Sequence, residues 1–210
     1  MMMRTVQFAL LLALCLALAG AAQATPLSLS LTDSPDIFSG LIDVTYDAAS
    51  DLLVADGLAL EFDDGTGVPL TIDSGDFHLE ATIPASGMAS AGSLSVLGSV
   101  DGVGPSLLTG ELSDFGFVDA GGDPFEFLFE ITGGALADAF GGVGSVLGVI
   151  LSDTGFQGHF ADNFDNLIAQ IPGTGFGVAD VAPLAVPEPA GLLLFAVGLG
   201  WVQLTLRRRV

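Results

Sequence analysis

Alternation of apolar and polar residues along short segments is the feature that most constrains the fold of this chain. The clearest example is residues 125–132, in which every second residue is apolar: Phe125, Phe127, Phe129 and Ile131. Because successive side chains of a β-strand point to opposite faces, such a segment buries one face and turns the other to water. The same alternation occurs over residues 27–32, 42–46, 58–62 and 76–83, and weaker candidate strands lie over residues 93–100, 107–118 and 146–151.

Turn sequences separate these segments. Asp-Gly pairs favour tight turns, and three of them occur here: Asp56-Gly57, Asp64-Gly65 and Asp101-Gly102. Many short strands joined by Gly-rich turns are typical of antiparallel sheets. We therefore predict an all-β fold, an antiparallel β-sandwich or a barrel-like ectodomain. One exception is residues 161–170, where apolar residues at helical spacing predict a short helix.

The first 24 residues have the parts of a secretory signal peptide. Arg4 provides the positive charge, an apolar run follows, and Ala22 and Ala24 form a small-x-small cleavage site. The apolar run is shorter than the roughly 20 residues that a membrane-spanning helix needs. We therefore predict export through the Sec machinery and a mature chain that begins at Thr25. The only cysteine, Cys15, would be removed with the signal peptide.

The C-terminus carries three segments in order. Residues 186–189 read Val-Pro-Glu-Pro, residues 190–206 are mostly apolar, and residues 207–209 are arginines. A helix over the apolar segment would be ~25 Å long, just short of a ~30 Å hydrocarbon core. The arginines would mark its cytoplasmic side by the positive-inside rule. The sequence therefore predicts a C-terminal transmembrane helix over residues 190–206; a plain single-pass anchor with a proline-containing stalk is the alternative.

This arrangement resembles the PEP-CTERM sorting signal of Gram-negative bacteria, in which a Pro-Glu-Pro motif precedes a short transmembrane helix and a basic tail. The resemblance covers residues 186–210 and implies recognition by an exosortase, a membrane-embedded cysteine transpeptidase-like enzyme that cuts near the motif. It assigns the sorting motif to Val186, Pro187, Glu188 and Pro189, and the basic tail to Arg207, Arg208 and Arg209. The same signal is also known as an ice-binding-protein C-terminal domain, but the scattered threonines of this chain do not predict an ice-binding face.

The central region divides into an acidic β-rich ectodomain, residues 25–171, and a Gly/Pro linker, residues 172–185. The chain has 25 Asp and Glu against four Lys and Arg, and its formal net charge is -21. All four basic residues lie in the two terminal segments. Since proteins bind nucleic acids by neutralising phosphates with Lys and Arg, the composition excludes nucleic acid as a partner.

No residue pattern in the central region predicts a catalytic site or a cofactor. His78 and His159 are far apart in the sequence and are expected to be exposed, whereas a zinc site needs three or four ligands. Glu126 and Glu130 would share a solvated strand face about 13 Å apart, beyond the separation used in glycoside hydrolysis. We therefore expect a non-enzymatic protein, with a secreted hydrolase as the weakest alternative.

Pairs of aspartates keep a structural calcium ion as an open alternative, because hard cations prefer carboxylate and carbonyl oxygens. The pairs are Asp33 with Asp36, Asp47 with Asp51, Asp63 with Asp64, Asp119 with Asp123, and Asp162 with Asp165; none fits an EF-hand. The first hypothesis is an exported protein, anchored in the inner membrane as a precursor and then associated with extracellular polysaccharide at the cell surface or in the matrix. The second is a calcium- or carbohydrate-binding adhesion module.

Overall fold

The computed structural model describes residues 25–118 and 122–185. The predicted signal peptide, with Ala22 and Ala24, lies outside these residues. The predicted sorting motif, transmembrane helix and basic tail, residues 186–209, also lie outside them. Within the described residues no helix has the length and apolar character that crossing a membrane requires.

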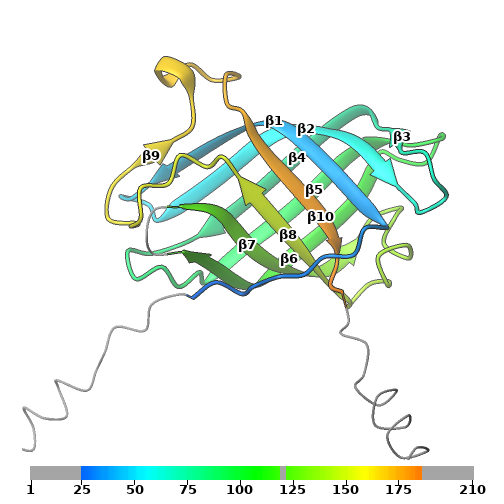
Figure 1. The fold of residues 1–210 in the computed structure, drawn as a ribbon, viewed down its shortest axis with the longest axis horizontal. Helices are drawn as coiled ribbons and strands as arrows, with labels where there is room; N and C mark the ends of the chain where they lie inside the picture. Colours follow the sequence, from blue (N-terminus) through cyan, green and yellow to red (C-terminus); the bar gives the residue numbers. More distant parts are fainter. Residues whose placement is uncertain (1–24, 119–121, 186–210) are drawn as a thin grey trace, which may run out of the picture.

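Eight antiparallel strands close into a barrel (Figure 1). In their order around the barrel they are β1 (Asp36–Asp47), β2 (Leu52–Asp63), β4 (Asp73–Thr82), β5 (Ala91–Ser99), β6 (Ser106–Val118), β7 (Gly122–Gly133), β8 (Val146–Ser152) and β10 (Gly177–Pro183). The ring closes because β10 pairs with β1, which also pairs with β2. Two short strands, β3 (Leu70–Thr71) and β9 (Phe164–Asp165), pair with β2 and β1 respectively. The predicted all-β antiparallel fold is confirmed, and the closed ring of pairings makes it a barrel rather than a sandwich.

The barrel interior holds the apolar side of the alternating segments. The predicted inward residues of two strands are fully or almost fully buried, namely Phe77, Leu79, Ala81 and Ile83 together with Phe125, Phe127, Phe129 and Ile131. At the end where β10 finishes, which we term the proximal end, Phe140 from the β7–β8 connection is buried with its ring 6.3 Å from that of Phe62. Burial of these large side chains supplies the main stabilisation of the fold.

The opposite, distal end of the barrel is filled by a long connection between β8 and β10. Phe156, Phe160 and Phe164 from this connection are buried, and the rings of Phe156 and Phe160 lie 4.7 Å apart. The Tyr46 hydroxyl contacts the carbonyl oxygens of Ile83 and Phe160 at 2.7 and 3.1 Å. The buried Tyr46 hydroxyl therefore has hydrogen-bond partners, and one of them links the β8–β10 connection to the barrel wall.

The helix predicted over residues 161–170 is wrong. Phe164 belongs to the short strand β9, and only Ile168–Gln170 form a 3-10 turn, in which Ala169 has a φ of 54°. The helical spacing of Phe160 and Phe164 has another cause, because both rings reach into the distal end of the barrel and pack 5.9 Å apart. An irregular connection can therefore imitate the apolar period of a helix.

The linker predicted over residues 172–185 is wrong for half of its length. Gly177–Pro183 form β10, whose neighbours are β1 and β8. Gly177 suits this position because a Cβ there would lie 2.9 Å from the carbonyl oxygen of Ile42. The glycine and alanine content that resembled a linker instead permits close packing within the barrel wall.

Bulges explain two further differences from the predicted pattern. The pairing of β1 with β2 shifts register between Phe38 and Ser39 and again between Gly40 and Asp43. As a result Ala59 points inward and Leu58 outward, the reverse of the predicted alternation. The Asp56-Gly57 pair forms no turn but lies within β2, where a Cβ on Gly57 would come 2.5 Å from Ile42 Cγ1.

Residues 25–31, which we term the N-terminal strap, cross the outside of the barrel (Figure 1). The strand predicted there does not form; apart from an isolated bridge between Leu31 and Leu184, the strap is held by other contacts. The Glu126 carboxylate on β7 accepts hydrogen bonds from the backbone amides of Ser28 and Leu29 at 2.8 and 2.9 Å. Glu126 is only 8% exposed, so the expectation of a solvated outer-face residue is wrong for it.

We expect Glu126→Ala to lower the free energy of unfolding by about 1–3 kcal/mol, because two charge-assisted hydrogen bonds are lost at a partly buried position. Urea titration measures this change, and limited proteolysis should show earlier cleavage within the strap. Glu130→Ala is the matched control, since Glu130 lies on the same strand but is exposed. Equal stability of the two variants would contradict the role assigned to Glu126.

Candidate functional site

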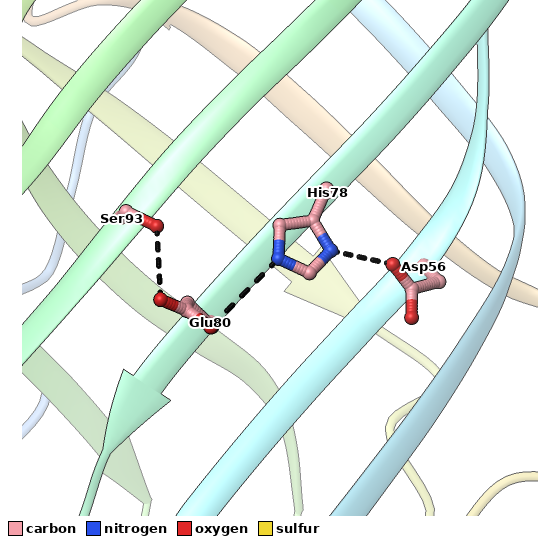
Figure 2. Close-up of polar contacts among 4 residues, drawn as sticks. All are labelled: Asp56, His78, Glu80 and Ser93. Carbon is pink, nitrogen blue, oxygen red and sulfur yellow. Dashed lines mark hydrogen bonds and ion pairs between the residues drawn. The ribbon is translucent and has the colours of Figure 1, made fainter.

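A ladder of polar side chains crosses the outer face of β2, β4 and β5 (Figure 2). His78 Nδ1 lies 2.5 Å from Asp56 Oδ1, and His78 Nε2 lies 3.9 Å from Glu80 Oε2. Ser93 donates its hydroxyl to Glu80 Oε1 at 3.3 Å. Strand register produces this order, because Asp56 lies opposite His78 and Glu80 lies opposite Ser93. His78 is partly exposed, as its position between two aliphatic or aromatic neighbours predicted.

The ladder continues into an open groove of about 480 Å³ on the same face. Its lining includes Glu80, Ser93, Glu111 and Leu112. Glu111 on β6 lies opposite Ser93, and Glu130 on β7 lies opposite Glu111. Close packing beside the groove requires a glycine at position 92, because a Cβ there would lie 2.5 Å from the Glu80 carbonyl oxygen and 3.1 Å from Leu112 Cβ. We term this surface the acidic groove.

The chemistry of the acidic groove is that of hydrogen-bond acceptors. Ionised carboxylates only accept hydrogen bonds, whereas serine and threonine hydroxyls both donate and accept. The groove thus suits ligands rich in hydroxyl donors, sugars among them. Across residues 25–118 and 122–185 no three His, Cys, Asp or Glu side chains gather closely enough to hold a metal ion.

Several aspartates of the suggested calcium pairs stabilise turns. The Asp47 carboxylate accepts hydrogen bonds from Ser50 Oγ and the Ala49 amide, which lower its pKa. Asp64 similarly accepts the Thr66 amide, and its hydrogen bonds with this threonine lower the pKa of Asp64. Each short loop is closed by its own aspartate in this way. Two further local contacts join Asp63 to the Gly65 amide and Asp165 to the Leu167 amide. Asp123 instead makes a long-range contact, because it accepts from the amides of Asp153 and Thr154.

The other predicted candidates are dispersed. His159 lies in the distal connection and its Nδ1 is 3.7 Å from Asp162 Oδ2, with both side chains exposed. Asp33 lies in the segment before β1, and Asp51 lies in the turn that precedes β2. Asp119 lies outside the described residues. The structure therefore does not bring the two histidines together.

Three aspartates converge on the outer face where β10, β1 and β2 meet, a cluster that sequence reasoning missed. Asp36 lies opposite Asp63, and Asp180 lies opposite Phe38, two residues along β1. Burial first, and then the adjacent carboxyls of Asp180 and Asp63, raise the pKa of Asp36 to about 8. Asp36 Oδ1 is buried without a hydrogen-bond partner. The cluster unites residues far apart in sequence, so only the strand register could have revealed it.

Comparison of the chain with protein-family models, curated proteins and solved structures found no match. A barrel by itself does not define an activity, because one fold can carry many functions. The function is therefore inferred from this chain's own residues, namely the acceptor groups of its outer surface and the terminal segments predicted from its sequence.

We expect the stability of the barrel to fall as the pH rises from about 4 to about 8. The folded state keeps the Asp36 proton up to a pKa of about 8, whereas the unfolded chain loses it near 3.8. A raised folded-state pKa favours folding below the unfolded value, and this stabilisation disappears as the pH passes the folded value.

Asp36→Asn should weaken this pH dependence, because asparagine mimics the neutral carboxyl. Thermal unfolding between pH 5 and 8.5 measures the effect, and Asp101→Asn, at an exposed turn between β5 and β6, is the control. If Asp36→Asn retains the full wild-type loss of stability over this range, the cluster is not its cause.

Proposed function

We propose that this chain is an exported, non-enzymatic protein of the cell surface or extracellular matrix, sorted by a PEP-CTERM signal and associated with extracellular polysaccharide. The observation that carries the proposal is the order of segments after the ectodomain. A Val-Pro-Glu-Pro motif, an apolar stretch and three arginines follow one another over residues 186–209. These match the motif, helix and tail by which an exosortase recognises its substrates.

The position of the motif supports processing rather than lasting anchorage. A 17-residue apolar helix over residues 190–206 is marginal for permanent insertion. The arginines would hold its end on the cytoplasmic side, so that Pro187, Glu188 and Pro189 lie at the outer boundary of the membrane. The last strand of the barrel, β10, ends at Pro183, and the Val-Pro-Glu-Pro motif begins three residues later in the sequence.

Processing can be tested in a host that carries an exosortase. We expect mass spectrometry of the mature protein to find Thr25 at its N-terminus and to find residues 191–210 removed. Replacing Pro187, Glu188 and Pro189 by alanine should leave full-length chain in the inner membrane. Wild-type protein that keeps Arg207, Arg208 and Arg209 at steady state in this host would favour the plain single-pass anchor.

The acidic groove supports the association with polysaccharide. Its carboxylates and hydroxyls can accept hydrogen bonds from sugar hydroxyls along one continuous face. The acids are distributed over neighbouring strands, so an extended sugar chain would meet several of them. This feature also keeps the second candidate open, a carbohydrate-binding adhesion module with the groove as its specific site.

Binding to matrix polysaccharide purified from the producing cell would test this role. We expect cosedimentation to fall severalfold for the double variant Glu80→Gln and Glu111→Gln, because an amide replaces a charge-assisted acceptor by a weaker one. Asp101→Asn with Asp138→Asn is the control, since it removes two charges at exposed positions outside the groove. Equal loss in both double variants would show that total charge, not the groove, determines binding.

A further inference from the structure

An apolar patch lies on the outer face of β1 and β2, where a barrel surface is normally polar. It consists of Phe38, Leu41, Leu58 and Leu60. Phe38 is 41% exposed, Leu41 63% and Leu58 44%, while Leu60 is partly buried. Grouped apolar side chains on a surface are characteristic of interaction sites, whereas isolated ones need no explanation.

The bulges of β1 and β2 create this patch. Because of the register shifts, Leu60 has no direct partner in the ladder, and Leu58 is turned outward beside Gly40. The side chains of Leu60 on β2 and Phe38 on β1 both lie over Gly40. A Cβ at position 40 would come 3.2 Å from Leu60 Cδ1 and 3.9 Å from Phe38 Cε1, so the glycine leaves room for both. Leu41 lies at the second bulge with a φ of 54°, a conformation that leucine rarely adopts. Strained backbone conformations cluster at binding sites, and a surface with a purely structural role gives no reason to keep an exposed leucine in one.

Carboxylates surround the patch on both sides. Phe38 has Glu61 opposite it on β2 and Asp180 opposite it on β10. Asp36 and Asp63 form a directly opposed pair towards the proximal end, and Asp43 and Asp56 form another towards the distal end. The patch is thus an apolar centre with an acidic rim, the complement of a surface with an apolar centre and a basic rim.

A second copy of the chain cannot supply that rim. No Lys or Arg occurs between residues 5 and 206, and the formal net charge of -21 would make two barrels repel each other. We propose that the β1–β2 patch binds a protein partner whose contact surface carries apolar side chains framed by Lys or Arg. The patch lies on the other side of the β2–β4 pairing from most of the acidic groove, so the barrel presents two distinct faces.

Each part of the surface has its own role in such a complex. The leucines and Phe38 lose solvent contact, which provides the non-directional part of the affinity. The acidic rim steers a cationic partner and fixes its orientation, so association should slow as ionic strength rises. Asp36 keeps its proton beside Asp63 in the free barrel, and a guanidinium or ammonium group next to the pair would favour ionisation of Asp36.

A pair of photoreactive peptides tests the proposal on the full chain in zwitterionic detergent. The first has the sequence Arg-Leu-benzoylphenylalanine-Leu-Arg, and the second replaces both arginines by glutamate. After irradiation, mass spectrometry locates the cross-links. We expect the arginine peptide to cross-link mainly within β1 and β2 and the glutamate peptide to give little product.

Two double variants separate the patch from general charge attraction. Leu41→Asn with Leu58→Thr replaces the two most exposed side chains of the patch without changing the charge, and asparagine tolerates the positive φ of residue 41. Val68→Thr with Val143→Thr is the matched control, because both valines are strongly exposed in proximal loops. We expect the first variant to lose about tenfold of the β1–β2 cross-link yield and the control to keep it within about twofold.

Three outcomes would overturn the proposal. Cross-links spread over all acidic surfaces would indicate charge attraction alone, and equal yields from the two double variants would exclude the patch. Wild-type dimers that the Leu41→Asn and Leu58→Thr variant abolishes in analytical ultracentrifugation would show that the occupant is a second copy. Circular dichroism and thermal unfolding of each variant confirm that a lost cross-link does not reflect a lost fold.

Discussion

The barrel depends on the pairing of its last long strand with its first. β10 fills the gap between β8 and β1, and without it both neighbours would have an unpaired edge. The interior phenylalanines would then meet water through an open wall. The end of β10 also holds the N-terminal strap and the residue after it, because the Thr32 amide donates to the Pro183 carbonyl and the Ala185 amide, two residues past β10, donates to the Ser30 carbonyl. Since β1 and β10 are separated by more than 120 residues, most of the chain must be present before closure.

Sequence reasoning succeeded where the strands are regular and failed where they are bulged. Residues 77–83 and 125–131 keep an unbroken period of two, so their inward faces could be read directly. In β1 and β2 a bulge inserts one residue and reverses the alternation, which local sequence does not reveal. The same limitation affected β10 and the distal connection. There small residues and spaced phenylalanines reflect contacts made with distant strands, not the local conformation.

The candidate sites were less accessible to prediction than the fold. Turn aspartates could be anticipated, because their partners lie within three residues, as with Asp47 and Ser50. The acidic groove and the Asp36 cluster depend on register across three or more strands, and register follows only from the complete ring of pairings. Glu126 shows the limit most directly, since its two hydrogen-bond partners come from a segment nearly one hundred residues earlier. No local pattern distinguishes it from the exposed Glu130.

The position of β10 has a mechanical consequence. The chain leaves the barrel at the end of this strand, so a force applied beyond Ala185 would pull along the strand axis. Hydrogen bonds of an antiparallel ladder lie perpendicular to the strands, and β10 has such a ladder on each side. The load would therefore shear both ladders together instead of opening them one bond at a time. A tether attached at this end would therefore load the barrel in shear along β10.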